Sequence, residues 1–319
     1  MDKDTKANRN VMKLLSELTL LDRFLFANTM EDRDTLQMVI SIILGRDICL
    51  ADRPQTEKEI RTTPWLRSIR LDVYTLDQDS RVYNTEVQQR NTGNLIKRSR
   101  FYQALIDSSL LLPGEIDFND IPPSYLITIM PFDLWGCGRY KYTFEMKCRE
   151  EDGLFLKDGA IRIFLNTRGT IEDGVSRELI DLLHYMEKTS DEEADQSHSE
   201  RIKKLHRRVS QVRSSEEIGV RFMQEWEERV YELREATEKG RAAGENIKLI
   251  GQVRKKASKN ISAQDCAEML EEETSLIEKI YDIMKQHPDW DDARVYEAIK
   301  TPEQRQAGMD IWSRLYMSE

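Results

Sequence analysis

Paired cysteines, which build disulfide frameworks and zinc centres, are missing from this chain of 319 residues. Its four cysteines, Cys49, Cys137, Cys148 and Cys266, are scattered and form no Cys-x-x-Cys pair. Paired spacing is what a structural zinc site needs, and unpaired cysteines are typical of a reducing compartment. We therefore expect buried free thiols, a cytoplasmic location and no zinc site.

Long apolar runs are missing as well. No window approaches the ~20 consecutive apolar residues of a membrane-spanning helix. The opening residues MDKDTKANRN also lack the apolar centre of a signal peptide. With 39% hydrophobic residues, the chain has enough apolar material for a sizeable core. The sequence thus predicts a soluble protein of two domains with no membrane partner.

The chain also lacks an excess of positive charge, because its formal net charge is −10. This balance argues against a protein that holds nucleic acid by bulk positive charge. It does not exclude an enzyme that acts on nucleic acid, because local basic patches can contact phosphate while a metal site must be acidic. Any affinity for DNA should then be modest and sensitive to salt.

The stretch from Ile69 to Gln88 predicts a β-hairpin. Its first half alternates apolar residues on one face, and residues 77–80, Asp-Gln-Asp-Ser, have the side chains of a polar turn. Residues 82–88 then resume strand-forming sequence, with Glu86 and Gln88 on one face because strand side chains alternate.

Two carboxylates of this hairpin are expected to face each other. If the strands pair about a turn centred near Asp79, Asp72 lies opposite Glu86 with β-carbons roughly 5 Å apart. Two carboxylates this close repel each other unless a cation lies between them. Magnesium is usually held by one or two carboxylates together with phosphate and water. The alternative from spacing alone is a solvent-facing hairpin with ordinary surface acids.

The segments "RLDVY" and "YNTEVQ" of the hairpin resemble the Asp-(x)n-Glu-x-Lys hairpin of the PD-(D/E)XK nuclease superfamily. More closely, the chain resembles the Rpn family of recombination-promoting nucleases, also described as transposases. The likeness continues through "LDRFLFANTM", "KRSRFYQALID", "IPPSYLITIMPFDLWGCG" and "DGAIRIFLNTRG", so it spans about residues 20–186 in order.

The resemblance implies an α/β fold, a restriction-endonuclease-like mixed sheet flanked by helices, followed by an all-helical C-terminal region. It implies Asp72 and Glu86 as metal ligands, with the Val87 carbonyl as a further ligand. The ion would be Mg²⁺ or another divalent cation such as Mn²⁺ or Ca²⁺. The superfamily lysine is replaced by Gln88, which leaves open which group activates water.

Three further residues are candidates for the site. The first helix of such nucleases flanks the site and can add an acidic residue, for which Asp22 is the candidate by position; a helix-terminal or surface Asp is the alternative. Arg98 and Tyr102 are four apart on a predicted helix and share one face. We assign Arg98, ahead of Arg100, to phosphate contact or transition-state stabilisation, against the alternative of a solvated face paired with acids.

Periodicity predicts the remaining elements of the first domain. Helices are expected over residues 12–44, broken at 31–34, and over residues 95–112 and from Ser176 onwards. Residues 125–130 form an apolar run typical of a buried central strand. Residues 142–147 and 161–165 predict further strands, and Trp135 is interpreted as a packing anchor, with base stacking as the minor alternative.

The second domain is expected to be helical. We place the boundary near residue 190, with a nuclease-like domain at 1–190 and a helical module at 191–319. The first ten residues of this module, 191–200, are expected to be an acidic connection. Residues 201–213 predict an exposed, salt-bridged helix, with a track for the DNA backbone as the alternative. Residues 216–250 predict one long helix with an apolar stripe. This module, without metal or nucleophile constellation, is interpreted as serving self-association or target docking.

Two functions follow from these observations. The first is a Mg²⁺-dependent DNA endonuclease that hydrolyses phosphodiester bonds, in which Asp72, Glu86, Gln88 and Arg98 form the catalytic site. The resemblance links it to DNA recombination, mobile elements or defence against foreign DNA. The second is a nuclease-like fold with a decayed site, serving interaction or oligomerisation, an alternative that rests on Gln88 in place of lysine.

Overall fold

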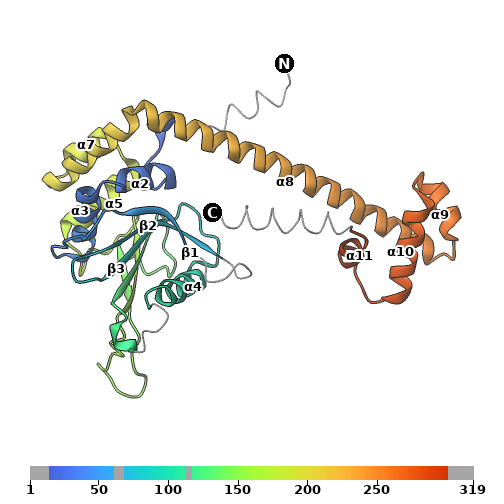
Figure 1. Ribbon diagram of the computed structural model, residues 1–319, viewed down its shortest axis with the longest axis horizontal. Coiled ribbons are helices and arrows are strands. Elements are labelled where there is room, and N and C mark those ends of the chain that lie inside the picture. The colour runs from blue at the N-terminus through green and yellow to red at the C-terminus, as the bar shows by residue number, and fades with distance from the viewer. Residues whose placement is uncertain (1–13, 61–67, 112–116, 301–319) are drawn as a thin grey trace. The chain divides into compact units, whose positions relative to one another are not determined.

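The computed structural model describes residues 14–60, 68–111 and 117–300. The chain divides into two compact units, residues 1–224 and residues 225–319. The N-terminal unit contains a mixed sheet with helices, and the C-terminal unit is helical (Figure 1).

A six-stranded sheet in the order β1-β2-β3-β4-β6-β5 organises the N-terminal unit. Its strands are β1 (Gln55–Ile60), β2 (Ile69–Leu76), β3 (Val82–Val87), β4 (Ser124–Met130), β5 (Lys141–Phe144) and β6 (Ala160–Asn166). The β3, β4 and β6 strands run parallel, and the other neighbours pair antiparallel. The buried run of β4 is central, as its apolar sequence predicts.

One face of the sheet carries the main core. Helices α2 (Arg23–Met30), α3 (Arg33–Leu44), α5 (Arg177–Lys188) and α7 (Glu200–Ser214) pack there, with the short α6 (Asp191–Gln196). Figure 1 shows α2, α3, α5 and α7 gathered beside the strands. The core residues from the sheet include Val73, Tyr83, Ile127 and Leu165. The burial of this large apolar surface is the main force that holds the unit together.

The other face of the sheet is covered by α4 (Leu95–Ser108). Leu105 and Ile106 of α4 form a second cluster with Leu71, Val82 and Leu126 of the sheet. The helix ends before the predicted residue 112, which lies outside the described residues together with Pro113 and Gly114. This packing fixes which side of α4 faces the hairpin.

The segment before Asp22 differs from the predicted helix. Residues 15–17 form a single 3-10 turn (Leu15–Glu17), and the first α-helix begins at Arg23 because the Asp22 carboxylate caps it. The predicted break at residues 31–34 is present, and Gly45 ends α3 with a left-handed φ of 66°. Met12 lies outside the described residues.

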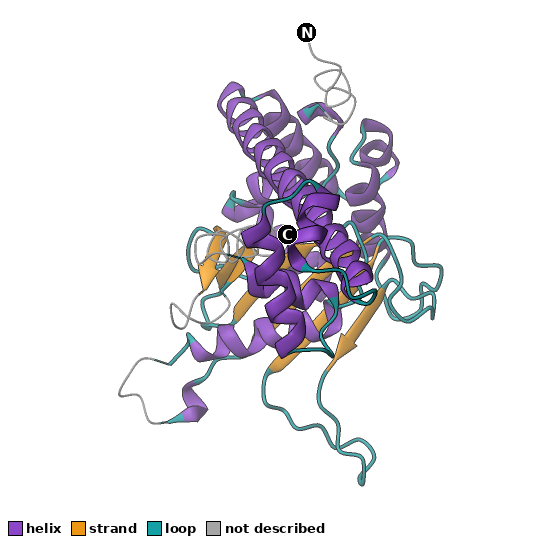
Figure 2. Cartoon of the chain, turned by 90° about the vertical axis from the view of Figure 1, so that its right-hand side faces the viewer, coloured by secondary structure: helices purple, strands orange, loops and turns teal. Residues whose placement is uncertain are grey.

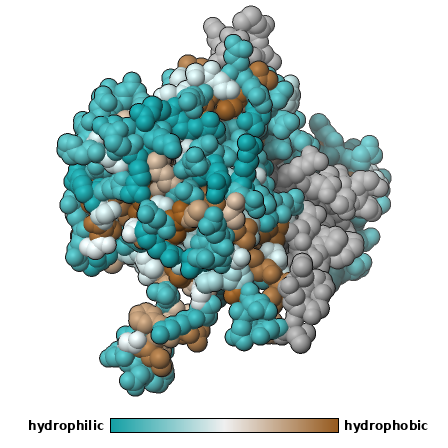
Figure 3. Space-filling view, turned by 60° about the vertical axis from the view of Figure 1, so that its left-hand side comes forward, coloured by the Kyte–Doolittle hydropathy of each residue, from teal (hydrophilic) through white to brown (hydrophobic). Residues whose placement is uncertain are grey.

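Trp135 is a packing anchor in the part of the chain that the structure describes. Its ring contacts the rings of Tyr142, Phe144 and Phe164, with centroids 4.8 to 5.2 Å apart. The connection between β5 and β6 then extends beyond the sheet (Figure 2) and forms the projection at the lower edge of Figure 3. Met146 and Leu156 on this connection are exposed. A second 3-10 turn, η2 (Phe118–Asp120), precedes β4.

The division between units falls after Gln224 rather than near residue 190. The reason is α7, whose Ile202, Leu205, Val209 and Val212 are buried in the N-terminal core. Its outer face is salt-bridged, with Arg201 paired to Glu178 and Lys203 to Glu200. The predicted acidic connection at 191–200 also contains a helix, α6, because Ser190 caps residues 191–193.

The C-terminal unit has its own small core. Helix α8 (Glu216–Ala257) contributes Ile250 and Val253, and α9 (Ala263–Leu270), α10 (Thr274–Gln286) and α11 (Asp292–Ile299) pack around them. Residues 216–250 are therefore one helix, as their spacing predicts, and the helix continues to Ala257.

The cysteines are free, but only one of them is buried. Cys266 is buried in the C-terminal core, Cys148 is half-buried, and Cys49 and Cys137 are exposed. The expectation of buried thiols is thus wrong for most of them, because scattered spacing carries no information on burial. Among the described residues, no helix is both long enough and apolar enough to cross a bilayer.

The turn after β6 generates a stability prediction. A β-carbon added at Gly169 would lie 2.7 Å from the Tyr140 backbone nitrogen and against the Tyr140 ring. We expect Gly169→Ala to lower the free energy of unfolding by about 1–3 kcal/mol, measured by urea denaturation, because neither neighbour can move without repacking.

Gly219→Ala on α8 is the matched control, since a β-carbon there meets nothing within 4 Å. Alanine favours the helix over glycine by roughly 0.5–1 kcal/mol, so this variant should be neutral or more stable. Equal stability of the two variants would contradict the packing at Gly169.

Candidate metal-dependent nuclease site

The turn of the β2–β3 hairpin is built by one buried carboxylate. Asp77 Oδ1 accepts the backbone N–H groups of Asp79 and Arg81 at 3.0 and 2.9 Å, and Tyr83 donates its hydroxyl to Oδ2 at 2.8 Å. Ser80 takes a left-handed φ of 62°. These contacts close the turn at a definite length, and the turn length sets the register of the two strands.

That register places the two candidate carboxylates opposite each other. The ladder runs from Leu76 paired with Val82 to Val73 paired with Thr85, and one further step brings Asp72 opposite Glu86. At this step the Val87 N–H donates to Asp72 Oδ2 at 3.2 Å. Asp72 and Glu86 are 5% and 6% exposed, so neither is a surface acid.

Asp72 is paired with Arg23, the first residue of α2. Its Oδ1 lies 2.7 Å from Arg23 Nε. Burial raises the pKa of the Asp72 carboxyl above its ordinary value, and the positive charge of Arg23 and the Val87 N–H bond oppose this rise. Asp22, the candidate accessory acid, instead accepts the Phe24 N–H at 3.0 Å and caps α2. Asp22 is therefore a helix-terminal residue, which is the alternative that the sequence offers for it. Because its cap starts α2, Asp22 positions Arg23, the first residue of that helix.

Glu86 is held from its own strand and from α4. Asn84 donates its amide to Glu86 Oε1 at 3.1 Å, and Arg98 Nη2 lies 3.7 Å from Oε2. Burial, followed by the negative charge of Asp72, raises the pKa of Glu86 to about 7, against the opposing charge of Arg98. Because the charge of one carboxylate shifts the other, the two form one electrostatic unit.

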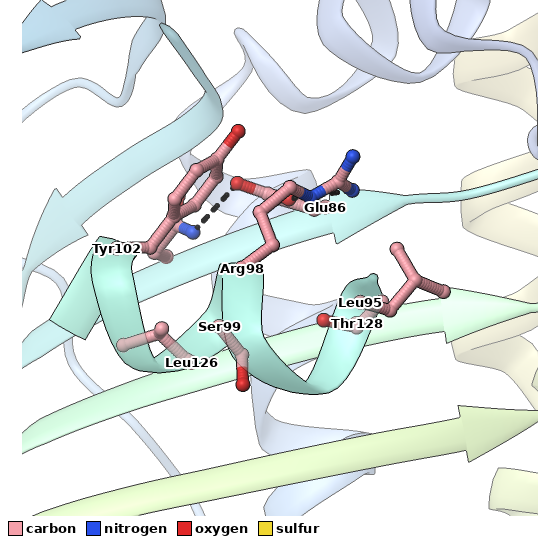
Figure 4. A pocket seen from close by; sticks show the side chains of 8 residues that line it. Glu86, Leu95, Arg98, Ser99, Tyr102, Leu126 and Thr128 are labelled. Atoms are coloured by element: carbon pink, nitrogen blue, oxygen red, sulfur yellow. Dashed lines mark hydrogen bonds and ion pairs between the residues drawn. The ribbon is translucent and has the colours of Figure 1, made fainter. Parts of the chain in front are cut away.

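The predicted pair on α4 reaches this unit. In Figure 4, Arg98 and Tyr102 extend from the helix to Glu86. The Arg98 guanidinium lies 5.6 Å from the centroid of the Tyr102 ring. Burial and the nearby Glu86 charge raise the pKa of the Tyr102 hydroxyl. A small pocket lies here, lined by Asn84, Glu86, Leu95, Arg98, Ser99, Tyr102, Leu126 and Thr128.

Gln88 follows β3 and adjoins the pair through the backbone. Its N–H donates to the Ile129 carbonyl at 2.8 Å, which holds it beside β4. Its side-chain amide donates to the Val87 carbonyl at 3.1 Å. The Val87 carbonyl, which the family resemblance implies as a metal ligand, is therefore in contact with the residue that replaces the superfamily lysine.

Comparison with known protein families decides the assignment of the fold. A family model described as PD-(D/E)XK nuclease family transposase matches residues 23–238, more than half of the chain. The chain belongs to this family. The expected Rpn and transposase likeness is confirmed, and the mixed sheet with flanking helices is a restriction-endonuclease-like fold. No curated protein and no solved structure matches the chain.

Nucleases of the PD-(D/E)XK type generally use divalent metal ions, so the fit of such an ion needs testing against the residues present. The described residues contain no group of three or more His, Cys, Asp or Glu side chains arranged to hold a metal. Two carboxylates with backbone, water and phosphate oxygens are nevertheless a sufficient donor set for Mg²⁺. The buried Asp72 and Glu86 fit this requirement, because burial and the charge of Asp72 raise the pKa of Glu86, and a bound cation would offset both effects.

Sequence reasoning missed Arg23 and Asn84. Asn84 has a readable signal, since it lies two residues before Glu86 in a strand and so shares its face. Arg23 has no such signal in the sequence beyond its place after a helix cap, because its contact with Asp72 joins residues that are distant in the chain.

The raised pKa of Glu86 generates a prediction for the metal-free protein. The pKa of this carboxyl is 4.5 ordinarily and about 7 in the folded chain. Between these two pKa values the folded state binds more protons than the unfolded state. The contribution of Glu86 to stability is therefore full below pH 4.5 and is lost as pH rises through about 7. In EDTA we expect the free energy of unfolding to fall by about 1–3 kcal/mol from about pH 5 to about pH 8.

Glu86→Gln should reduce this slope, because the amide does not titrate, whereas the exposed Glu228→Gln should leave it unchanged. Urea denaturation at a series of pH values measures both. The same slope in wild type and Glu86→Gln would show that Glu86 is not the titrating group.

Proposed function

We propose that this chain is a metal-dependent DNA endonuclease that hydrolyses phosphodiester bonds at Asp72 and Glu86. The observation that carries the proposal is the buried carboxylate pair of the β2–β3 hairpin, flanked by two arginines, in a chain of a nuclease family. Such a pair is costly to keep ionised without added positive charge, and a functional ion supplies that charge.

In the proposed site Asp72 and Glu86 hold the divalent ion, with the Val87 carbonyl as a further ligand. The ion, Mg²⁺ or alternatively Mn²⁺ or Ca²⁺, would supply Lewis-acid charge at a phosphodiester oxygen. Asn84 and Arg23 orient the two carboxylates through their contacts with Glu86 and Asp72.

Arg98 is the proposed phosphate contact. It lines the pocket beside Glu86, and its planar guanidinium suits bidentate contact with phosphate oxygens. Lys97 and Arg100 on the same helix are exposed and add local positive charge to an acidic chain. Tyr102 packs beside Arg98 as an accessory residue that limits its motion.

Gln88 is proposed to position the attacking water or to contact the phosphate. A neutral amide accepts no proton at ordinary pH, so Gln88 does not act as the general base. The word transposase in the family description supports a role with mobile elements, and the resemblance to Rpn proteins is the basis for proposing DNA recombination or defence against foreign DNA. We further propose that the helical C-terminal region serves self-association.

The second candidate function is a decayed nuclease fold that serves interaction only. The observation behind it is Gln88, whose amide donates to the Val87 carbonyl where the superfamily has a lysine. Calorimetry with Mg²⁺ separates the two functions, because a decayed site would show no affinity that depends on Asp72 and Glu86.

Asp72→Asn tests the catalytic proposal directly. We expect plasmid nicking with Mg²⁺ to fall about 1,000-fold or more, since losing a ligand charge removes several kcal/mol of transition-state stabilisation. The asparagine oxygen can still accept the Val87 N–H, so folding should be retained and can be checked by circular dichroism.

Asp79→Asn on the turn of the same hairpin is the control, because Asp79 is exposed and pairs only with the neighbouring Arg81 in the described structure. It should nick at the wild-type rate. Full activity in Asp72→Asn would end the assignment of the site.

Arg98→Met tests the phosphate contact. We expect the single-turnover cleavage rate to fall about 100-fold, because one donor aimed at developing charge contributes that much. Mg²⁺ binding measured by calorimetry should be retained, since Arg98 is not a ligand. Arg100→Met, a change of the same size on the exposed side of α4, should cleave normally. An equal loss in both variants would indicate general electrostatic attraction instead of a specific contact.

A further inference from the structure

We propose that α8 pairs antiparallel with α8 of a second copy of this chain, through residues 223–240. The proposal deepens the self-association proposed above, and it does not depend on the carboxylate site. Figure 1 shows α8 as one uninterrupted helix. Its buried residues, Ile250 and Val253, lie near its C-terminal end, and Ile218 and Phe222 of its first turns pack against the N-terminal core. Between them, no residue from 223 to 240 is fully buried, so these turns present side chains to solvent or to a partner.

A seam of alternating three- and four-residue steps follows this part of α8. Such steps place residues on one stripe with a period of 3.5, which is the pattern of a two-helix coiled coil. Leu233 is 63% exposed and Met223 is 42% exposed, which is unusual for large apolar side chains on a single stripe. The seam consists of Met223, Trp226, Val230, Leu233, Thr237 and Gly240.

Side-chain size favours an antiparallel arrangement of two seams. If Val230 lies against Leu233 of the second copy, then Trp226 lies against Thr237 and Met223 against Gly240. Each outer layer thus pairs a large side chain with a small one. Gly240 has room for this, because a β-carbon there would meet nothing within 4 Å. Complementary sizes across layers are what dense packing requires.

Charge beside the seam favours the same arrangement. In the antiparallel pair Glu227 faces Arg234 of the second copy, and the two-fold axis makes this contact twice. In a parallel pair Arg229 would instead face Arg234, which places like charges together. Glu227 and Arg234 are both exposed on α8, seven residues apart, and so lie too far from each other to pair within one helix.

The proposed contact is about 27 Å long at 1.5 Å per residue. A self-complementary stripe with its own charge partners points to a second copy as the occupant, because the same residues supply both halves of each contact. Two other occupants are outcomes of the test: residues 301–319 of the same chain, which lie outside the described residues, and an unrelated helix.

The experiment is light scattering on the full-length chain over a range of concentrations. We expect a concentration-dependent dimer, and Glu227→Arg should weaken dimerisation about tenfold or more because both symmetric contacts become repulsive. Glu228→Arg carries the same charge change to the neighbouring exposed position, which faces away from the seam, and should dimerise like wild type. Circular dichroism checks that both variants remain helical.

Orientation is tested by Arg234→Glu. The antiparallel pair predicts weaker dimerisation, whereas a parallel pair predicts stronger dimerisation because the Arg229–Arg234 repulsion is removed. The double variant Glu227→Arg with Arg234→Glu should restore the wild-type dimer.

A wild-type monomer at every concentration would overturn the proposal and would favour the two other occupants. A dimer that neither Glu227→Arg nor Leu233→Asp weakens would overturn it too, since another surface must then be responsible. Asp72→Asn should dimerise like wild type, so failure of the nuclease assignment and failure of this interface give different results.

Discussion

The proposed site depends on the burial of two like charges side by side. Asp72 and Glu86 are almost completely removed from solvent, and each loses hydration that water would otherwise provide. The structure offsets this loss with Arg23 and Arg98, which come from helices in different core clusters of the N-terminal unit. Without those helices the hairpin would be an acidic ribbon whose carboxylates turn to water. The fold therefore maintains a charge arrangement that a short peptide could not maintain.

The turn at Asp77 is coupled to this arrangement. Its carboxylate fixes the number of residues between the strands, and strand side chains alternate, so an insertion of one residue would move Glu86 away from Asp72. A residue that makes no contact with the site thus determines whether the site exists. The distribution of charge follows the same logic. An overall negative chain keeps its useful positive charge local, on α4 beside the pocket.

Several expectations from the sequence differ from the structure for identifiable reasons. The apolar spacing before Asp22 suggests a helix, but the first α-helix begins only after Asp22, which caps it. Leu18 and Leu20 are buried all the same, and they lie in an irregular segment. Residues 191–196 look like a polar connection, but Ser190 supplies a cap for α6. Residues 201–213 look like an exposed helix, although one face carries Ile202 and Val209 into the core. In the first two cases a helix cap outweighed the apolar or polar spacing, and in the third the spacing was outweighed by packing against distant residues.

The amino-acid sequence by itself determined the hairpin, its register and the opposition of Asp72 and Glu86, because turn chemistry and strand alternation act over a few neighbouring residues. It also determined the central strand β4, because neither face of its apolar run can be exposed to solvent at low cost. Tertiary structure alone decided that Arg23 joins the site, that the pKa of Glu86 rises to about 7, and that α7 belongs to the N-terminal core. Each of these depends on which distant elements meet and how much water they exclude, and no local pattern in the chain encodes that.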